Sequence, residues 1–210
     1  SLVGEDEIWD VAVKQAGVIR VGDVEELSDT IRAFYMLPSM RGRRIGIASW
    51  SGGAGIMSID ACQRSGLEVA ELSPITIKRL SALTPSWQDV GNPMDMWPAV
   101  GVAKTASFLE FQEIVVKAFL DDPGVNGVLF MLVAWAPTFE IGLCQLAEEV
   151  AESYPDKPLI FYLHGPFVNE VKSKLEETGK TLVFTSPERA MRVLKHLADY
   201  SEFRATCENS

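Results

Sequence analysis

The sequence predicts an α/β protein in which helices cover both faces of a parallel sheet. From about residue 44 to residue 200, short apolar runs of strand length alternate with longer segments that place apolar residues at helical spacing. Glycine, proline and serine mark most boundaries between these segments, which is typical of short loops that join strands to helices. Alternation of strand and helix along a chain puts successive strands parallel to one another.

Five strands are expected, each a short apolar run bounded by turn residues. They are residues 45–48, 67–72, 125–133, 159–163 and 181–184. About five strands with intervening helices suit an open, doubly wound sheet of flavodoxin-like type, with the order 2-1-3-4-5 when the strands are numbered along the chain.

Helices are expected between these strands, and two of them have clear start signals. Ser73-Pro74 and Ser186-Pro187 each combine an N-cap serine with a proline in the first turn. The expected helices cover residues 54–65, a segment from 74, then 103–120, 139–153, 168–178 and 187–200.

Residues 1–40 are expected to form a helical segment ahead of the sheet. Two short amphipathic helices are separated by the extended residues 18–21, and Asp23 is the expected N-cap of the second helix. Residues 38–44, which contain proline, glycine and arginines, mark a boundary. Serine, threonine and glutamate at the other end predict fraying. The predicted division is therefore 1–40, a main domain 41–203, and a frayed tail 204–210.

Composition limits the partners. The 210 residues carry a formal net charge of −10, which opposes binding of nucleic acid by a broad basic face. The sequence has no long apolar run and no signal sequence, and its three cysteines have no metal-ligand spacing, so we expect a cytoplasmic protein with no membrane partner and no metal site. Any phosphate must then be held locally, by backbone N–H groups and a helix dipole.

The glycine-rich segment after the first strand is the main candidate site. It consists of Ser51, Gly52, Gly53, Ala54 and Gly55. Glycines permit a positive φ and close approach of an anion to the backbone, and the start of the following helix supplies unpaired N–H groups. Its position beyond the carboxyl end of a strand favours a ligand site over a turn that needs glycine only for packing.

A second candidate is the turn-forming run that contains Asn92, Pro93 and Asp95, which should lie at the same edge of the sheet. Its polar side chains could bond to a ligand. An Asx-type turn, in which Asn92 and Asp95 bond only to the backbone, is the alternative.

Four stretches of the chain carry a family resemblance. They are GEDEIWDVAVKQAGVIRVGDVEEL, RIGIASWSGGAGIMSIDACQRSGLEVAELSPITIKRL, GNPMDM and FTSPERAMRVLKHLADY. Together they resemble the C-terminal part of the CoA-ligase (alpha) subunit of ADP-forming acetyl-CoA and acyl-CoA synthetases, in the succinyl-CoA synthetase superfamily. The resemblance implies a domain of an acid–thiol ligase that interconverts acyl-CoA, ADP and phosphate with the acid, CoA and ATP through a phosphohistidine.

The same resemblance implies where the chemistry lies. The phosphorylated histidine is expected upstream of Ser1, in the domain of which residues 1–40 would be the tail, so no catalytic residue is expected here. CoA, ADP or ATP, and Mg²⁺ would belong to CoA-binding and ATP-grasp parts of the full enzyme, and the chain alone is expected to be inactive and to hold no cofactor. Residues 51–55 would be the phosphate cradle, with the loop of Asn92, Pro93 and Asp95 beside it. Trp50-Ser51 departs from the Asn-Ala of many relatives, which leaves the role of Trp50 open.

The two histidines and three tryptophans in predicted loops have simpler interpretations. His164 follows the fourth strand and is expected to have a structural or supporting role. His196 is expected to be a solvated residue of the last helix. Trp87, Trp97 and Trp135 lie in loops, where packing is expected and contact with an acyl group is the alternative.

Two other functions remain open from the residues alone. Gly53-Ala54-Gly55 with Ser58 approximates a dinucleotide-binding turn, and Glu71 could then hold a ribose. A receiver or flavodoxin-type signalling module is disfavoured, because the third strand ends at residues 130–133 with no phosphorylatable aspartate.

Overall fold

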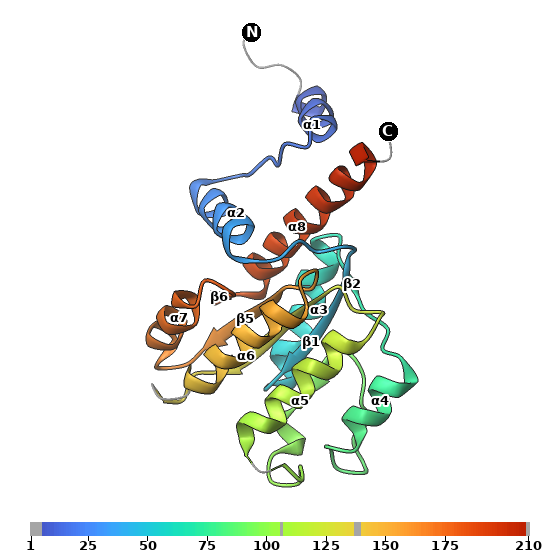
Figure 1. The fold of residues 1–210 in the computed structure, drawn as a ribbon, viewed down its shortest axis with the longest axis vertical. Coiled ribbons are helices and arrows are strands. Elements are labelled where there is room, and N and C mark those ends of the chain that lie inside the picture. Colours follow the sequence, from blue (N-terminus) through green and yellow to red (C-terminus); the bar gives the residue numbers. More distant parts are fainter. Residues whose placement is uncertain (1–5, 106, 137–139, 209–210) are drawn as a thin grey trace.

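The computed structural model describes residues 6–105, 107–136 and 140–208, and its centre is one parallel sheet (Figure 1). The main strands are β1 (Arg44–Ser49), β2 (Glu68–Val69), β4 (Gly127–Val133), β5 (Leu159–His164) and β6 (Leu182–Phe184). They lie in the order β2-β1-β4-β5-β6, and every neighbouring pair is parallel. This is the predicted order, so the predicted fold class is confirmed.

Helices cover the two faces of the sheet (Figure 1). On one face, α3 (Gly52–Arg64) contacts α8 (Pro187–Glu208). On the other face, four helices contact one another in succession. These are α4 (Pro74–Ser81), α5 (Phe108–Asp121), α6 (Glu140–Ser153) and α7 (Val168–Glu177). The core between the layers is filled by buried aromatic rings from α5 and the strands, among them Phe119, Phe130 and Phe161.

Several element boundaries differ from the predicted ones. The second strand is reduced to two residues, and α5 starts at Phe108 instead of residue 103, because the Ser107 side chain accepts a hydrogen bond from the Glu110 N–H and begins the helix there. The last helix extends to Glu208, so the prediction that residues from 204 onward fray is wrong as far as Glu208. An ion pair between Arg204 and Glu208, one turn apart at 2.8 Å, supports this extension.

A short strand that the sequence did not predict, β3 (Met94–Asp95), pairs in parallel with the end of β1. The first two residues of β1 pair with β2, and its last two pair with β3. Between these two pairings, β1 has no strand neighbour on this side within the described part of the chain. The side chain of Asn92 occupies that interval.

The Asn92 side chain bonds to the backbone of β1 and to the backbone of Ala70, directly after β2. Its Oδ1 accepts a hydrogen bond from the Ile47 N–H at 2.9 Å, and its Nδ2 donates to the carbonyl oxygens of Ile45 at 2.8 Å and Ala70 at 2.9 Å. Asn92 is followed by a cis peptide bond to Pro93. The amide side chain therefore replaces a missing strand residue and fixes the loop against β1.

Two helices precede the sheet, α1 (Asp6–Gln15) and α2 (Val24–Met36), and the predicted N-cap Asp23 accepts a bond from the Glu26 N–H at 2.7 Å. α2 packs on α8 through polar groups. The Arg189 guanidinium donates two bonds of 2.8 Å to the buried carboxylate of Asp29. The contact between these helices therefore combines charge and hydrogen bonds with an edge contact between the rings of Phe34 and Tyr200, whose centroids lie 5.2 Å apart.

His196 lies in this contact and is buried, so the prediction of a solvated residue is wrong. The Thr30 hydroxyl donates to the Glu26 carbonyl at 2.7 Å and therefore accepts from His196 Nδ1 at 2.9 Å. The Nε2 atom lies 3.4 Å from Glu26 Oε1. Burial lowers the pKa of His196, an effect that Glu26 and Asp199 oppose and that Lys195 and Arg192 reinforce.

Replacing Asn92 should destabilise the fold. Asn92→Ala removes the bonds of Asn92 to the Ile47 N–H and the Ala70 carbonyl, and one of two bonds to the Ile45 carbonyl, which still accepts from the Ala70 N–H. We therefore expect the free energy of unfolding to fall by about 2–4 kcal/mol. Urea denaturation measures this loss. Asn169→Ala, at an exposed position on α7, is the control and should change stability by less than about 0.5 kcal/mol. Equal effects of the two substitutions would contradict the role given to Asn92.

Stability should depend on pH through His196. Because its folded pKa lies below the unfolded value of about 6.5, the unfolded chain binds the proton more readily, and stability is lost as pH falls below that value. We expect wild-type stability to decline more steeply than that of His196→Gln between about pH 7.5 and 5.5. His164→Gln, at the other histidine of the chain, serves as the control for loss of a histidine. Parallel curves for wild type and His196→Gln would rule out this linkage.

Candidate functional site

The turn from β1 into α3 presents backbone donors at the carboxyl edge of the sheet. Ser51 is the N-cap residue: its hydroxyl accepts from the Ala54 N–H at 3.4 Å, and its carbonyl accepts from the Gly55 N–H at 2.9 Å. Within the described residues, the N–H groups of Gly52 and Gly53 have no such partner, and both glycines are exposed. These two N–H groups are therefore the donors that a ligand can reach.

The glycines of this turn are needed for space and not for a positive φ. None of Gly52, Gly53 and Gly55 has a positive φ, so that part of the prediction is wrong. A Cβ atom on Gly52 would lie 3.0 Å from Asp95 Oδ2, and one on Gly55 would lie 3.3 Å from two atoms of the Pro93 ring. Glycine thus allows the loop of residues 91–96 to pack against the first turn of α3.

Gly53 differs from its neighbours because the space beside it is open. A Cβ atom there would meet only Ser51 Oγ, at 3.8 Å. A side chain at this position would not meet the loop of residues 91–96, and it would lean toward the start of α3, because Cα–Cβ bonds in a helix tilt toward its N-terminus.

The two candidate segments come together as the sequence predicted. Asp95 Oδ1 accepts a bond from the Trp97 N–H at 3.0 Å, while Oδ2 faces Gly52. The positive end of the α3 dipole stabilises a carboxylate in this place. The negative charge of the Asp95 carboxylate repels another anion. The loop therefore places a negative group beside the N–H donors and adds no donor of its own.

Two polar residues of this region were not predicted from the sequence. Ser49, fully buried at the end of β1, donates from Oγ to the Ser51 carbonyl at 2.7 Å and accepts from the Ser51 N–H at 3.2 Å. Gln88 donates to the Asp95 carbonyl at 2.7 Å. A serine that ends an otherwise apolar strand was the available signal for the first. Both hold backbone near the α3 turn.

Trp50 belongs to the core. Its indole ring is buried and makes edge contacts with Phe108, at 4.3 Å between ring centroids, and with Trp97 at 6.0 Å. Its backbone N–H donates to the Met131 carbonyl at 3.2 Å. Trp50, whose role the sequence left open, therefore packs in the core directly before the turn.

The three loop tryptophans are exposed. More than half of the accessible surface of Trp87, Trp97 and Trp135 remains open to solvent. The prediction that they pack is therefore wrong within this chain, apart from the contact of Trp97 with Trp50. His164 is exposed at the end of β5, on the same edge of the sheet.

The described part of the chain gives little basis for a metal site, a cysteine nucleophile or a membrane span. No group of three or more His, Cys, Asp or Glu side chains that could hold a metal ion is found there. Burial raises the pKa of the Cys62 thiol to about 12, so this cysteine is not a nucleophile at neutral pH. Among the described helices, none is both long and apolar enough to cross a bilayer.

Comparison with known proteins identifies relatives of the chain. It is 31% identical over 206 residues to an acetate–CoA ligase (ADP-forming) II of Archaeoglobus fulgidus, an alignment that covers 97% of this chain and 30% of the relative. It is 29% identical over 210 residues to the alpha subunit of acetate–CoA ligase (ADP-forming) I of Pyrococcus furiosus, with 98% of this chain and 43% of the subunit aligned. The chain thus spans less than half the length of these relatives. No family model matches it.

A solved structure shares the fold. Acetyl-coenzyme A synthetase 1 of Ca. Korarchaeum cryptofilum, described as dinucleotide forming and solved in complex with phosphate and ADP, superposes with a TM-score of 0.79 at 23% identity. The match covers 100% of this chain and 44% of the other. On the sequence similarities, which extend over nearly the whole chain, it is a homologue of the ADP-forming acetate–CoA ligases and corresponds to a fragment of their alpha subunit.

Proposed function

We propose that the chain is the part of an ADP-forming acyl-CoA synthetase that stabilises a phosphohistidine intermediate. The full protein would act as an acid–thiol ligase and interconvert acyl-CoA, ADP and phosphate with the acid, CoA and ATP. The observation that carries the proposal is the pair of exposed N–H groups at Gly52 and Gly53, at the start of a helix. The ADP-forming ligases among the relatives support the reaction class.

The proposed mechanism is electrostatic. A phosphoryl group placed before α3 would accept hydrogen bonds from the two N–H groups and would feel about half a positive charge from the helix dipole. Ser51, Ala54 and Gly55 shape this cradle through the capping bonds, and the loop of Asn92, Pro93 and Asp95 forms its wall. Donors fixed before reaction lower the energy of the charged group without reorganisation.

The reactive histidine would come from outside residues 1–210. His196 is buried between α2 and α8, and His164 is exposed at the end of β5, where its ring makes an edge contact with Tyr162. CoA, ADP or ATP, and Mg²⁺ would be held by CoA-binding and ATP-grasp domains or subunits. The isolated chain should therefore neither form acyl-CoA nor become phosphorylated.

The surface of α2 supports the proposal that residues 1–40 are the tail of the preceding, phosphohistidine-bearing domain. This helix buries polar residues, including Glu26, Asp29 and Thr30, against α8. Its exposed large apolar residues are Val24, Leu27, Ile31, Phe34 and Tyr35, of which Phe34 also makes an edge contact with Tyr200 of α8. An apolar face at helical spacing requires cover. A domain that precedes α2 in the full enzyme would provide it.

The dinucleotide-binding alternative has weaker support. Glu71, which would hold the ribose, lies beyond the two residues of β2, and the relatives described above are acyl-CoA ligases. The function of the ligases is therefore the one that the geometry and the similarities support together.

Blocking the cradle should slow phosphoryl transfer. In the full-length ligase, Gly53→Val would place a branched side chain over the N–H groups of the α3 turn, and we expect histidine phosphorylation to slow by about 10²-fold or more, as when an oxyanion donor is removed. Rapid-quench measurement of the acid-labile phosphoenzyme gives this rate.

The matched control for that variant is Gly53→Ala, whose single methyl group fits the open space. Both variants must first show a wild-type circular dichroism spectrum and thermal midpoint. A folded Gly53→Val enzyme that is phosphorylated at the wild-type rate would show that the α3 turn does not act on the phosphoryl group.

Removing the charge of Asp95 should strengthen phosphate binding to the isolated chain. Asp95→Asn retains an oxygen to accept the Trp97 N–H bond but removes a like charge beside the donors, so affinity should rise by about 1 kcal/mol, or about fivefold. Calorimetric titration with phosphate at constant ionic strength measures the change. Asp60→Asn, an equal charge change at an exposed position of α3, controls for net charge. Weaker binding in Asp95→Asn would make Asp95 a positive contributor and contradict its assigned effect.

A further inference from the structure

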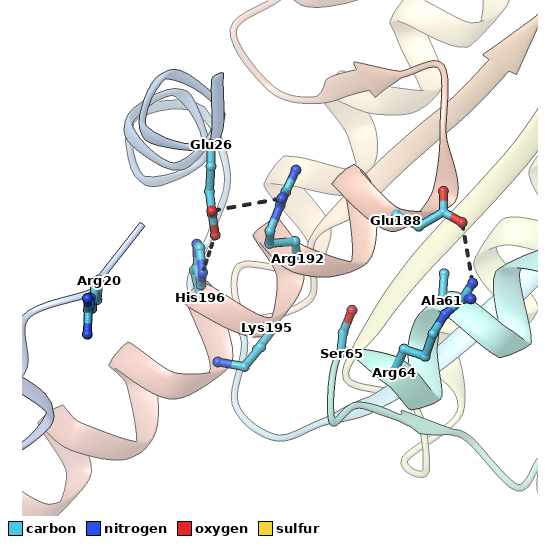
Figure 2. A pocket seen from close by; sticks show the side chains of 9 residues that line it. All are labelled: Arg20, Glu26, Ala61, Arg64, Ser65, Glu188, Arg192, Lys195 and His196. Carbon is cyan, nitrogen blue, oxygen red and sulfur yellow. Dashed lines mark hydrogen bonds and ion pairs between the residues drawn. The ribbon is translucent and has the colours of Figure 1, made fainter. Parts of the chain in front are cut away.

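A polar cavity of about 460 Å³ lies at the other end of α3 from the glycine-rich turn (Figure 2). Its charged lining consists of Arg20, Arg64, Arg192 and Lys195, with Glu26 and Glu188. These cations gather at one place on a chain whose net charge is −10, but two of them are already paired with carboxylates outside this lining, Arg20 with Asp10 and Lys195 with Asp199. Arg64 and Arg192 are therefore the cations through which the cavity would attract an anion.

The cations converge because three separate elements meet there. Arg20 lies in the segment between α1 and α2, Arg64 ends α3, and Arg192 and Lys195 lie three residues apart on the same side of α8. The cavity consequently exists only when the N-terminal segment is docked on α8. The partial negative charge of the α3 C-terminus opposes anion binding, but it amounts to only about half a charge.

Two arginines of the cavity, Arg64 and Arg192, are only loosely engaged by its carboxylates. Arg64 Nη2 lies 3.4 Å from Glu188 Oε1, and Arg192 Nη1 lies 3.8 Å from Glu26 Oε2. Charge-assisted hydrogen bonds of this type are usually about 2.7–2.9 Å long. Glu26 already accepts a bond of 2.7 Å from the Gly22 N–H, which holds its carboxylate away from Arg192. Each guanidinium has five N–H donors, so both can serve a further acceptor.

We propose that this cavity binds a compact polyanion of the phosphate or pyrophosphate class, as a site separate from the glycine-rich cradle. α3 has 13 residues, so the two sites lie about 20 Å apart along the helix and cannot share one small ligand. A bound anion would link Arg64 of α3 to Arg192 and Lys195 of α8. This proposal does not depend on the proposed enzymatic function.

The two histidines of the chain provide separate reporters, one for the cavity and one for the edge of the sheet where the cradle lies. His196 lines the cavity, and His164 lies at the carboxyl edge of the sheet with the cradle. We expect titration with inorganic pyrophosphate, at constant ionic strength, to shift the imidazole proton resonances of His196 saturably. His164 should not follow the same curve. Equal, unsaturated shifts of both histidines would indicate general screening and overturn the proposal.

Variants assign the binding to the cavity. The double substitution Arg64→Gln and Arg192→Gln should weaken pyrophosphate binding at His196 by about tenfold or more, because it removes both loosely engaged guanidinium groups. The single substitution Arg64→Gln, at a largely exposed position, should weaken it about threefold and serves if the double variant does not fold.

Two controls complete the experiment. Arg79→Gln with Lys117→Gln changes the net charge equally at positions outside the cavity and should preserve the His196 titration. Gly53→Val, at the cradle, should also preserve it. A His196 titration that is unaffected by the loss of Arg64 and Arg192, or that is abolished by Gly53→Val, would show that the cavity is not the binding site.

Discussion

The hydrogen bonds from Asn92 to three backbone groups are the constraint on which the candidate site depends. β2 leaves β1 after two residues, and the Asn92 side chain takes the place of a strand neighbour before β3 restores pairing. With the loop fixed in this way, Pro93 and Asp95 lie directly against the first turn of α3. That turn can accept them only because Gly52 and Gly55 have no side chains. A single amide group thus positions both the wall of the site and the residue that sets its charge.

The electrostatics of the site follow from its small number of donors. The chain repels anions at long range, so binding must rely on short-range interactions with the N–H groups of Gly52 and Gly53 and with the α3 dipole. Asp95 opposes that binding from the side. Two N–H donors and a helix dipole, opposed by the charge of Asp95, would bind a free phosphate ion weakly. A phosphoryl group tethered to another domain could still bind there, because a tether raises its effective concentration. This balance is consistent with a domain that functions only within a larger enzyme.

The sequence was sufficient for the sheet order, and local chemistry explains why. Alternating patterns, together with capping residues such as Asp23 and Ser73, act within a few residues and can be recognised without tertiary contacts. Features that depend on distant partners were missed. His196 is buried against α2, where its partner Thr30 is 166 residues away in the sequence. β3 pairs with the part of β1 that the short β2 leaves without a strand neighbour. The glycine-rich turn was recognised from the sequence, but the reason for glycine at Gly52 and Gly55 is the loop packed against them, which spacing alone does not reveal.

An amide-resolved titration tests the central claim most directly. The ¹⁵N-labelled chain would be titrated with inorganic phosphate at constant ionic strength and followed by ¹H–¹⁵N correlation spectra. The account predicts that the amide protons of Gly52 and Gly53 shift downfield together along one saturable curve, as expected for N–H groups that gain a charged acceptor. Smaller changes should occur at Ala54 and Gly55, whose N–H groups already bond to Ser51. Phosphate binding that leaves the resonances of Gly52 and Gly53 in place would contradict the account.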